Sequence, residues 1–491
     1  MLHVNEEATR CLLCEDAPCT KACRTGDPAR AVRAIRFDNA GNAWRWTASC
    51  SEADLERAEQ ACIHYDRPVR LRELLRSVQP VPEAAAQASL PSLAIDFVGI
   101  HCENPFFLAS SAVCTNYEMV AHAFDAGWAG VFYKTICKQD IREVSPRFDA
   151  VKDDTRFAGF RNMEQLSENP FEVDFDILRR LKRDYPSKVV IASIMGQYEE
   201  EWVELAKMAE EAGCDAVELN FSCPQMRLSG LGSDVGQNPE LVTFYTAYVK
   251  RSVNIPVIPK MTPNITNINQ PAMGAYFAGA DAISAINTIK SVTMNPDAAV
   301  SGKQTMSGYS GRAVKPIALR HILEMTMNPL FDGSHGKRVE FSGIGGIMTW
   351  RDALEFLQLG CRNVQVCTAV MEYGYRIIDD LVQGMQTYMA QKGIERLEDI
   401  VGSELENFVL PSDLDRETMV LPVIDRSICI GCGRCYVSCR DGGHQAITFD
   451  AQTRQPRIIG AKCVGCHLCR LVCPTGAVGP AKRFQKSSRT Y

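Results

Sequence analysis

The chain of 491 residues is too long for one hydrophobic core, and its composition of 46% hydrophobic and 23% charged residues is that of an ordinary soluble protein with several domains. Its 53 basic and 59 acidic residues leave a formal net charge of −6. That balance argues against a nucleic-acid-binding protein, which would carry a concentrated basic excess.

No apolar run is long enough to cross a bilayer, and the first residues lack the apolar segment of a signal peptide. We therefore expect a cytoplasmic protein with no membrane partner. In that reducing compartment the 21 cysteines are expected to be metal ligands, catalytic thiols or core residues, because disulfides rarely persist there.

The N-terminal block, residues 1–85, is predicted to be a small helical domain rich in cysteine. Its thiols follow one another at short intervals: Cys11, Cys14, Cys19, Cys23, Cys50 and Cys62. Such density indicates a metal site. One four-iron cluster would be held by cysteines alone, and a second only with ligands other than cysteine. The alternatives are a structural zinc module or a metal-free remnant. The Pro/Ala/Ser-rich residues 78–92 predict a linker to the next domain.

Residues 90–410 repeat a pattern of short apolar strand, loop and amphipathic helix. The eight candidate strands begin at Phe106, Gly130, Val189, Ala216, Pro256, Ala282, Val339 and Asn363. Uniformly apolar strands of this kind are typical of a parallel sheet that is buried on both faces. They predict an α/β fold, a (β/α)8 TIM barrel, with an open, doubly wound sheet as the competing arrangement.

Polar residues and glycines are placed where these strands become loops. They are Ser110, Lys134, Asn162, Asn220, Cys223, Lys260, Asn287, Thr288, Gly345, Gly346 and Thr368. In a barrel the carboxyl ends of the strands meet at one mouth, which is where the active site lies. We therefore expect these residues to surround one cleft.

Two glycine-rich stretches follow predicted strands without matching the dinucleotide-binding fingerprint. GLGSDVG at residues 230–236 has the wrong spacing, and SGIGGI at residues 342–347 lacks the third glycine. Electrons from a nicotinamide would therefore have to arrive through a partner protein.

After a break in helical periodicity at residues 410–423, the last predicted domain, residues 420–491, carries two matching cysteine runs. They are Cys429, Cys432, Cys435 and Cys439, then Cys463, Cys466, Cys469 and Cys473. This is the spacing of a ferredoxin with two 4Fe–4S clusters, in which the fourth cysteine of each run binds the other cluster. We therefore assign Cys473 to the first three cysteines and Cys439 to the second three. Two structural zinc sites are the alternative.

A barrel linked to one-electron clusters needs a group that converts single electrons into hydride, and flavin is the usual one. Lys134 and Lys260 would place positive charge beside a reduced, anionic flavin, although a strand-end lysine can equally serve a structural ion pair. The glycine loops GYSGRAVKP and SGIGGI suit the binding of a phosphate.

The same mouth offers groups that suit a flat, polar substrate. The amides of Asn162, Asn220 and Asn287 would bind a ring that alternates N–H and C=O edges, although each could instead be a buried structural asparagine. Cys223 lies beside them in the sequence and could donate a proton to substrate carbon while hydride arrives on the opposite face.

Together these motifs resemble dihydropyrimidine dehydrogenase, in particular the PreA-type subunit of the bacterial NAD-dependent enzyme. The similarity runs from about residue 95 to the C-terminus through NMEQ, NFSCPQM, GSDVGQNPEL, SGYSGRAVKPIALR, CGRCYVSC and CVGCHLC. The resemblance implies FMN in the barrel, an NAD(P)H- and FAD-binding partner subunit in a hetero-oligomer, and reduction of uracil or thymine to the 5,6-dihydropyrimidine.

The resemblance also implies roles for particular residues. Those that match the FMN contacts are Ser110, Lys134, Thr135, Lys260, Gly311, Gly345, Gly346, Cys367 and Thr368. Those that match the pyrimidine contacts are Asn162, Asn220, Phe221, Ser222, Asn287 and Thr288, and Cys223 matches the general acid.

The N-terminal block resembles another part of the same system, the iron–sulfur module that begins the NADH- and FAD-binding partner, through EATRCLLCEDAPCTKAC. Arg24 replaces the usual proline after the fourth cysteine, and only two later cysteines remain. The resemblance therefore supports one cluster there rather than two. Its candidate ligands are Cys11, Cys14, Cys19 and Cys62.

Three functions compete. The leading hypothesis is pyrimidine reduction at FMN, with hydride to C6, a proton from Cys223 to C5, and electrons from the partner through the clusters. The second is a dihydroorotate-type dehydrogenase on the same barrel, although the sequence shows no evident arginine pair for a carboxylate. The third is an electron-relay subunit whose barrel is catalytically idle.

Overall fold

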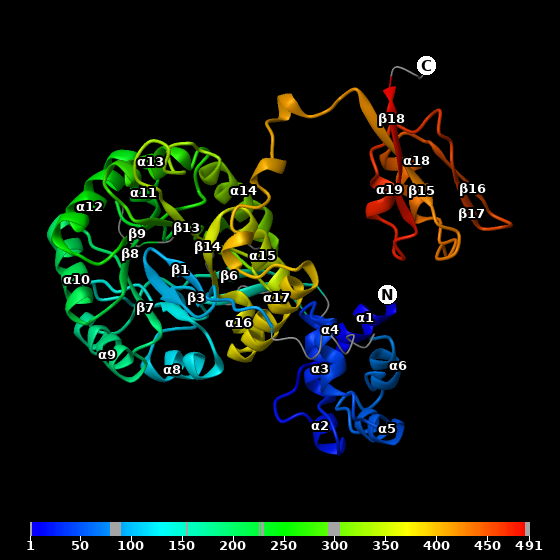
Figure 1. Cartoon of the computed structure of the whole chain (residues 1–491), viewed down its shortest axis with the longest axis horizontal. Helices are drawn as coiled ribbons and strands as arrows, with labels where there is room; N and C mark the ends of the chain where they lie inside the picture. The colour runs from blue at the N-terminus through cyan, green and yellow to red at the C-terminus, as the bar shows by residue number, and fades with distance from the viewer. Residues whose placement is uncertain are drawn as a thin grey trace. The chain divides into compact units, whose positions relative to one another are not determined.

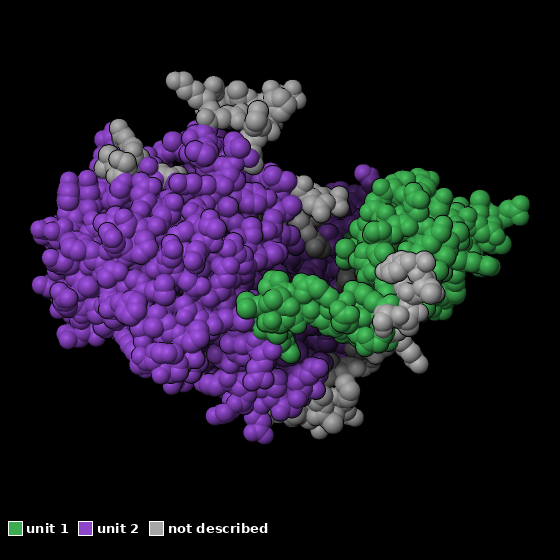
Figure 2. All heavy atoms as spheres, turned by 90° about the horizontal axis from the view of Figure 1, so that it is seen from above, with its two compact units in different colours: residues 1–7, 407–491 green, residues 8–406 purple. Residues whose placement is uncertain are grey.

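The computed structural model describes residues 2–78, 90–153, 156–224, 226, 230–292 and 305–486. The chain forms two compact units, residues 8–406 and residues 1–7 with 407–491, which Figure 2 shows in separate colours. The N-terminal helices from residue 8 onward therefore belong to the same compact unit as the central domain. The predicted linker, residues 78–92, falls largely outside the described residues.

The central domain is a closed barrel of parallel strands in the order β10-β13-β14-β3-β4-β7-β8-β9. These strands are β3 (Phe106–Leu108), β4 (Gly130–Phe132), β7 (Val189–Ile194), β8 (Ala216–Asn220), β9 (Val257–Lys260), β10 (Ala282–Ala285), β13 (Glu340–Ile344) and β14 (Cys361–Val366). Every residue of β7 and β8 is buried, because helices cover the barrel outside and side chains fill it inside. The predicted TIM barrel is confirmed, and its closure excludes the open, doubly wound sheet.

Helices surround the barrel as an outer ring (Figure 1). They are α8 (Tyr117–Ala126), α9 (Phe171–Asp184), α10 (Glu199–Glu211), α12 (Pro239–Ser252), α13 (Asn269–Phe277), α14 (Lys315–Thr326), α15 (Trp350–Gln358) and α17 (Ile378–Lys392), and two shorter helices are α11 (Ser233–Gly236) and α16 (Thr368–Tyr373). Local sequence sets where some of them begin. The Asn116 side chain caps α8, and Thr349 forms a capping box with Asp352 at α15.

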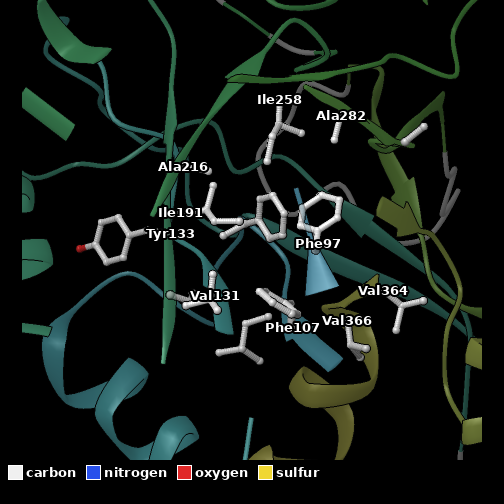
Figure 3. Close-up of a cluster of buried hydrophobic side chains, with 14 of the residues drawn as sticks. Phe97, Phe107, Val131, Tyr133, Ile191, Ala216, Ile258, Ala282, Val364 and Val366 are labelled. Carbon is white, nitrogen blue, oxygen red and sulfur yellow. The ribbon is translucent and has the colours of Figure 1, made fainter. Parts of the chain in front are cut away.

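The hairpin of β1 (Ile95–Phe97) and β2 (Ile100–Cys102) lies at the amino end of the barrel strands, where the Val98 N–H donates to the carboxylate of Glu340 at the start of β13. Phe97 is fully buried among side chains that include Ile191 and Ala216 (Figure 3). The amino end of the barrel is therefore filled by apolar side chains. This leaves the carboxyl end as the place for a polar cleft.

A four-stranded antiparallel sheet is inserted in the order β11-β12-β6-β5. Its strands are β5 (Phe148–Asp153), β6 (Arg156–Asn162), β11 (Ile289–Ser291) and β12 (Ser307–Ser310). Asn162 is thus the last residue of β6 and does not follow a barrel strand, which corrects our expectation. The segment GYSGR also begins in this sheet, on β12.

The N-terminal block is helical, as predicted. Its helices are α1 (Leu2–Arg10), α2 (Pro18–Ala22), α3 (Pro28–Arg36), α4 (Ala40–Ala43), α5 (Glu52–Gln60) and α6 (Leu71–Arg76). Helix α3 contacts α17 of the barrel through charged groups. Arg33 Nε donates to Asp380 Oδ2 over 2.6 Å, and Arg30 donates to the neighbouring Asp379 over 2.6 Å. The Arg33 and Asp380 side chains are only 10% and 3% exposed, so this contact is a buried ion pair.

The other unit has the ferredoxin-like arrangement that the cysteine spacing predicts. β15 (Thr418–Ile424) pairs with β18 (Val478–Gln485), and β16 (Ile447–Asp450) pairs with β17 (Gln455–Ile458). Helices α18 (Arg434–Gly442) and α19 (Leu468–Leu471) each begin within one of the cysteine runs. Cys435 and Cys469, one from each helix, share a small buried core with Ile447 and Val478.

Within the described ranges, no helix combines the length and the hydropathy that a membrane span requires.

Candidate functional site

A cleft with about 1000 Å³ of empty volume opens at the carboxyl end of the barrel strands. The residues predicted to contact the cofactor all line it: Ser110, Lys134, Thr135, Lys260, Gly311, Gly345, Gly346, Cys367 and Thr368. So do the predicted acid and most of the predicted substrate residues: Cys223, Asn162, Asn220, Asn287 and Thr288. The fold therefore brings together residues that are spread over more than 250 positions of the sequence, from 110 to 368.

Phe221 and Ser222 do not line the cleft. The Phe221 ring is fully buried and packs against Trp202, with 5.1 Å between ring centroids. Ser222 Oγ donates to Asn220 Oδ1 over 2.8 Å and accepts from Asn287 Nδ2 over 2.9 Å. Ser222 therefore orients the two amides from behind. The side chains alternate along the strand and its extension, so Phe221 faces outward while Asn220 faces the cleft.

Both predicted lysines are buried and are paired with carboxylates that the sequence analysis missed. Lys260 Nζ lies 3.5 Å from Glu218 Oε1, and Lys134 Nζ lies 3.2 Å from Glu164 Oε1. Glu218 precedes Asn220 by two positions on β8, so the period of a strand places both on the inner face. That spacing, and a carboxylate within an otherwise apolar strand, could have revealed Glu218.

A chain of hydroxyl groups continues from Glu218 to the cleft. Glu218 accepts hydrogen bonds from Ser284 Oγ over 2.8 Å and from Ser193 Oγ over 3.0 Å. Ser193 Oγ lies 2.9 Å from Thr135 Oγ1, which in turn accepts from Asn220 Nδ2 over 2.9 Å and lies 3.1 Å from Ser110 Oγ. Because these groups are bonded to one another and all but Ser110 are buried, the polar wall of the cleft is held in one arrangement.

The opposite wall of the cleft is made of glycine-rich loops. Gly311, Gly345 and Gly346 have φ values of +92°, +128° and +74°, which favour glycine. A Cβ on Gly346 would lie 2.8 Å from the backbone nitrogen of Lys315, at the start of α14. Only glycine therefore lets the loop after β13 approach the start of α14. The backbone of Gly345 and Gly346 in this loop lines the cleft.

One polar atom in the cleft is buried without a partner among the described residues. Gln365 donates to Ser342 Oγ over 2.9 Å, but its Oε1 atom accepts no hydrogen bond. Buried polar atoms of this kind are usually bonded, so this one suits a ligand that carries an N–H group. With two lysines, a hydroxyl wall and a glycine loop, the residues present fit a flavin mononucleotide.

In the ferredoxin-like unit, Cys439 joins the second cysteine run. Cys439, Cys463, Cys466 and Cys469 line one pocket of about 350 Å³. Cys435 lies near the other three thiols, because the pKa of its thiol is raised by burial and then by Cys432, Cys429 and Cys473. The structure therefore brings together the crossed sets that the spacing predicts.

The arrangement of these thiols also bears on the zinc alternative. A tetrahedral zinc site needs four sulfur atoms about 2.3 Å from one ion. Zinc sites use four ligands each without a crossed fourth ligand, whereas the pocket that Cys439 shares with the second cysteine run has the crossed pattern of a two-cube ferredoxin.

The six N-terminal thiols form a group of four and a group of two. The group of four lines a pocket of about 430 Å³ together with apolar side chains, and it consists of Cys11, Cys14, Cys19 and Cys62. This is the set of candidate ligands from the sequence analysis. Burial, and next the neighbouring Cys11, raise the pKa of Cys19 to about 11. Cys23 and Cys50 lie outside this pocket, and their sulfur atoms are 3.3 Å apart.

The N-terminal pocket is attached to the helix that borders the cleft. Arg36 donates to the carbonyl oxygen of Cys11 over 2.6 Å and to Tyr373 Oη over 3.1 Å. Arg376 donates to the carbonyl oxygen of Leu13 over 2.6 Å. Tyr373 is the last residue of α16, and Thr368 at the other end of that helix lines the cleft. The thiol pocket and the cleft therefore lie at opposite ends of one short helix.

Comparison with known proteins assigns two parts of the chain. Residues 92–389 match the dihydroorotate dehydrogenase family, and residues 422–479 match the 4Fe-4S dicluster domain. The chain is 50% identical over 407 residues to the NAD-dependent dihydropyrimidine dehydrogenase subunit PreA of Escherichia coli (strain K12), covering 81% of this chain and 98% of that protein.

Two further relatives match a shorter stretch. The chain is 36% identical over 347 residues to the chloroplastic dihydropyrimidine dehydrogenase (NADP(+)) of Arabidopsis thaliana, covering 67% of this chain and 81% of that protein. It is 35% identical over 318 residues to the catalytic subunit of dihydroorotate dehydrogenase B (NAD(+)) of Pyrococcus abyssi, covering 64% of this chain and 99% of that protein. The chain therefore belongs to the dihydroorotate dehydrogenase family and, within it, to the PreA-type subunits of NAD-dependent dihydropyrimidine dehydrogenase.

Proposed function

We propose that this chain catalyses the reduction of uracil or thymine to the 5,6-dihydropyrimidine, or the reverse reaction, at an FMN bound in the barrel cleft. The observation that carries this proposal is the meeting of two buried lysines, three asparagines and Cys223 around one cleft. The 50% identity to a PreA subunit, over 98% of the length of that protein, supports the proposal.

Two sides of the cleft would hold FMN. Lys134 and Lys260 would lie beside the isoalloxazine ring, and the loop of Gly345 and Gly346, with Thr368 at the start of α16, would hold the phosphate through backbone N–H groups. When bound, FMN would exchange hydride with the substrate and single electrons with the clusters. The buried carboxylates of Glu164 and Glu218 keep the two lysine ammonium groups in place.

The asparagines would hold the pyrimidine flat in the cleft. Ser222 orients the amides of Asn220 and Asn287, which leaves their planes fixed before substrate binds. Asn162 approaches from the inserted sheet, where its Oδ1 atom accepts from the Glu164 N–H over 2.6 Å. Cys223, which is 5% exposed, would hold the proton that is delivered to C5, next to the carbon that receives hydride.

The lining of the cleft favours a pyrimidine without a carboxylate. Among the described residues that line it, the cations are Lys134 and Lys260, both already paired, and no arginine is present. Bidentate binding of a carboxylate is the usual task of arginine. The second hypothesis, a dihydroorotate-type dehydrogenase, rests on the family match but lacks this group.

Three iron–sulfur clusters, each bound by one group of four thiols, would carry electrons to the cleft. Two 4Fe–4S clusters would be bound by the crossed sets in the ferredoxin-like unit. A third would be bound by Cys11, Cys14, Cys19 and Cys62, which surround a pocket of similar size. An NAD(P)H- and FAD-binding subunit would supply the electrons in a hetero-oligomer, since neither glycine-rich stretch in this chain has the dinucleotide spacing.

The test uses the reconstituted chain with its flavin reduced anaerobically by dithionite. Uracil is expected to reoxidise the flavin within the turnover time of an enzyme, and orotate at the same concentration is expected to be at least about a hundredfold slower, because the substrate carboxylate would be left unpaired. Faster reoxidation by orotate would favour the dihydroorotate reaction. Reoxidation by neither compound, with the clusters still exchanging electrons, would favour the idle relay.

A further inference from the structure

We propose that Cys23 and Cys50 form a reversible disulfide, a redox modification site that is separate from the four-thiol pocket and from the barrel cleft. The two sulfur atoms are already 3.3 Å apart. A covalent bond requires them to approach to about 2.0 Å, which is a small movement for two side chains.

The segments around the two thiols hold them against one another. Thr25 Oγ1 donates to the carbonyl oxygen of Ser49 over 2.9 Å, and Ser49 Oγ donates back to the carbonyl oxygen of Thr25. The Asp27 N–H donates to the carbonyl oxygen of Trp46 over 2.8 Å. Segments 23–27 and 46–50 are therefore aligned by three hydrogen bonds, and the approach of the sulfur atoms does not depend on a chance contact of mobile side chains.

Gly26 makes room for this contact. A Cβ at that position would lie 2.4 Å from Cys50 Sγ and 2.5 Å from the carbonyl oxygen of Trp46. Any larger residue would push the Cys50 sulfur away from Cys23. The local sequence is thus compatible with the thiol pair only because residue 26 is glycine.

The pair lies apart from the other four thiols. Neither Cys23 nor Cys50 lines their pocket. Two adjacent thiols outside that pocket are suited to reversible oxidation, which is how disulfides occur in reducing compartments.

The oxidation requires an external two-electron acceptor, and a small-molecule disulfide is the class that fits. The thiolate of Cys50, the more exposed of the two, attacks that disulfide and releases one small thiol. The Cys23 thiolate then attacks the Cys50 sulfur and releases the second small thiol. The protein loses two electrons and two protons, and the small disulfide gains them as two thiols.

The environment of the pair suits a disulfide that persists once it has formed. Burial, and next the hydrogen bond with Cys23, raise the pKa of Cys50 to about 12. The reduced pair therefore gains no stability as a thiolate, unlike the strongly oxidising dithiols whose thiolate is stabilised. Formation of the disulfide should be slow at neutral pH, because little of the Cys50 thiol is then present as the reactive thiolate.

The bond would join the two parts of the N-terminal domain that carry the pocket thiols. Cys23 directly follows α2, which contains Cys19, and Cys50 precedes α5, which is followed by Cys62. A cross-link between residues 23 and 50 would restrict the unfolded domain and fix these two segments. The oxidised domain should therefore open less often than the reduced one.

The full-length protein, kept anaerobic, is incubated with oxidised glutathione, alkylated, digested and examined by peptide mass spectrometry. The expected result is a peptide pair linked through Cys23 and Cys50, two fewer alkylated thiols per chain, and reversal by dithiothreitol. Release of N-terminal peptides by a protease should also slow by about tenfold or more, since the cross-link restricts the unfolded domain.

The matched variants are Cys50→Ser, which removes one partner, and Cys102→Ser, which removes a buried thiol elsewhere. C50S should lose the linked peptide, and C102S should form it as the wild type does. The proposal is overturned if Cys23 and Cys50 remain alkylatable, if Cys50 is recovered only as a glutathione adduct, or if either thiol is linked to a pocket cysteine. Peptide mapping of the wild type gives this answer even if C50S fails to fold.

Discussion

Lys260 Nζ lies 3.5 Å from Glu218 Oε1 inside the barrel, where the lysine side chain is 3% exposed and the glutamate side chain is not exposed at all. Lys260 lines the cleft at the end of β9, and Glu218 lies on β8 two residues before its end. A buried charge that loses its partner destabilises the folded protein. The charge on Lys260 therefore depends on Glu218, and the charge on Glu218 depends on Lys260.

Glu218→Gln should therefore lower the free energy of unfolding by about 3 kcal/mol, because the Lys260 charge loses its buried partner. Glutamine keeps the shape of the side chain and can still bond to Ser193 and Ser284. Urea unfolding measures the change. The double variant Glu218→Gln with Lys260→Met should recover part of the loss, and an E218Q protein as stable as the wild type would show that the pair is not charged.

Cys223→Ser should reduce pyrimidine turnover by about 10²- to 10⁴-fold, the usual contribution of a general acid, because a serine hydroxyl is a far weaker acid than a thiol. FMN content should not change, since Cys223 is assigned to the substrate. Steady-state rates and flavin absorbance measure both effects. Cys137→Ser is the control, because it alters a buried thiol close enough to influence Cys223 electrostatically. Turnover within a few fold of the wild type in C223S would remove Cys223 from the mechanism.

Iron analysis distinguishes the two groups of N-terminal thiols. With three clusters the reconstituted protein should contain about twelve irons per FMN, and Cys19→Ser or Cys62→Ser should lower this to about eight, at four irons per cube. Cys23→Ser should leave the count at about twelve, because Cys23 lies outside the pocket. About eight irons in the wild type would mean that the N-terminal pocket holds no cluster.

His321, on α14, makes stability depend on pH. Burial, and next the charge of Arg320, lower the pKa of His321 below its ordinary value, 6.5. As the pH falls below about 6.5, the unfolded chain gains a proton that the folded protein resists, so the free energy of unfolding should fall. His321→Gln should remove this part of the pH dependence between pH 7.5 and 5.5, as followed by urea midpoints. An unchanged slope in H321Q would assign the effect to other groups.

The strands of the barrel were predictable because each one is a local signal. Runs such as VVIASIM and AVELNFSC are apolar over the length of one strand, and burial on both faces requires that composition. The cysteine runs were predictable for a similar reason, since three ligands of each cube come from one short turn. The polar residues just after the strands, among them Lys134 and Asn287, could be grouped because all strand ends of a barrel meet at one mouth.

By itself the sequence determined the barrel and the two-cluster domain, because these depend on periodicity and spacing along the chain. Together with the resemblance to a known family, it also named many of the polar residues that line the cleft. Only the tertiary structure decided that Glu218 and Glu164 pair with the two lysines, that Asn162 arrives from an inserted sheet, and that Cys23 and Cys50 meet apart from the other thiols. The physical reason is that these contacts join segments far apart in sequence, and their partners are set by strand order and helix docking, which no local pattern records.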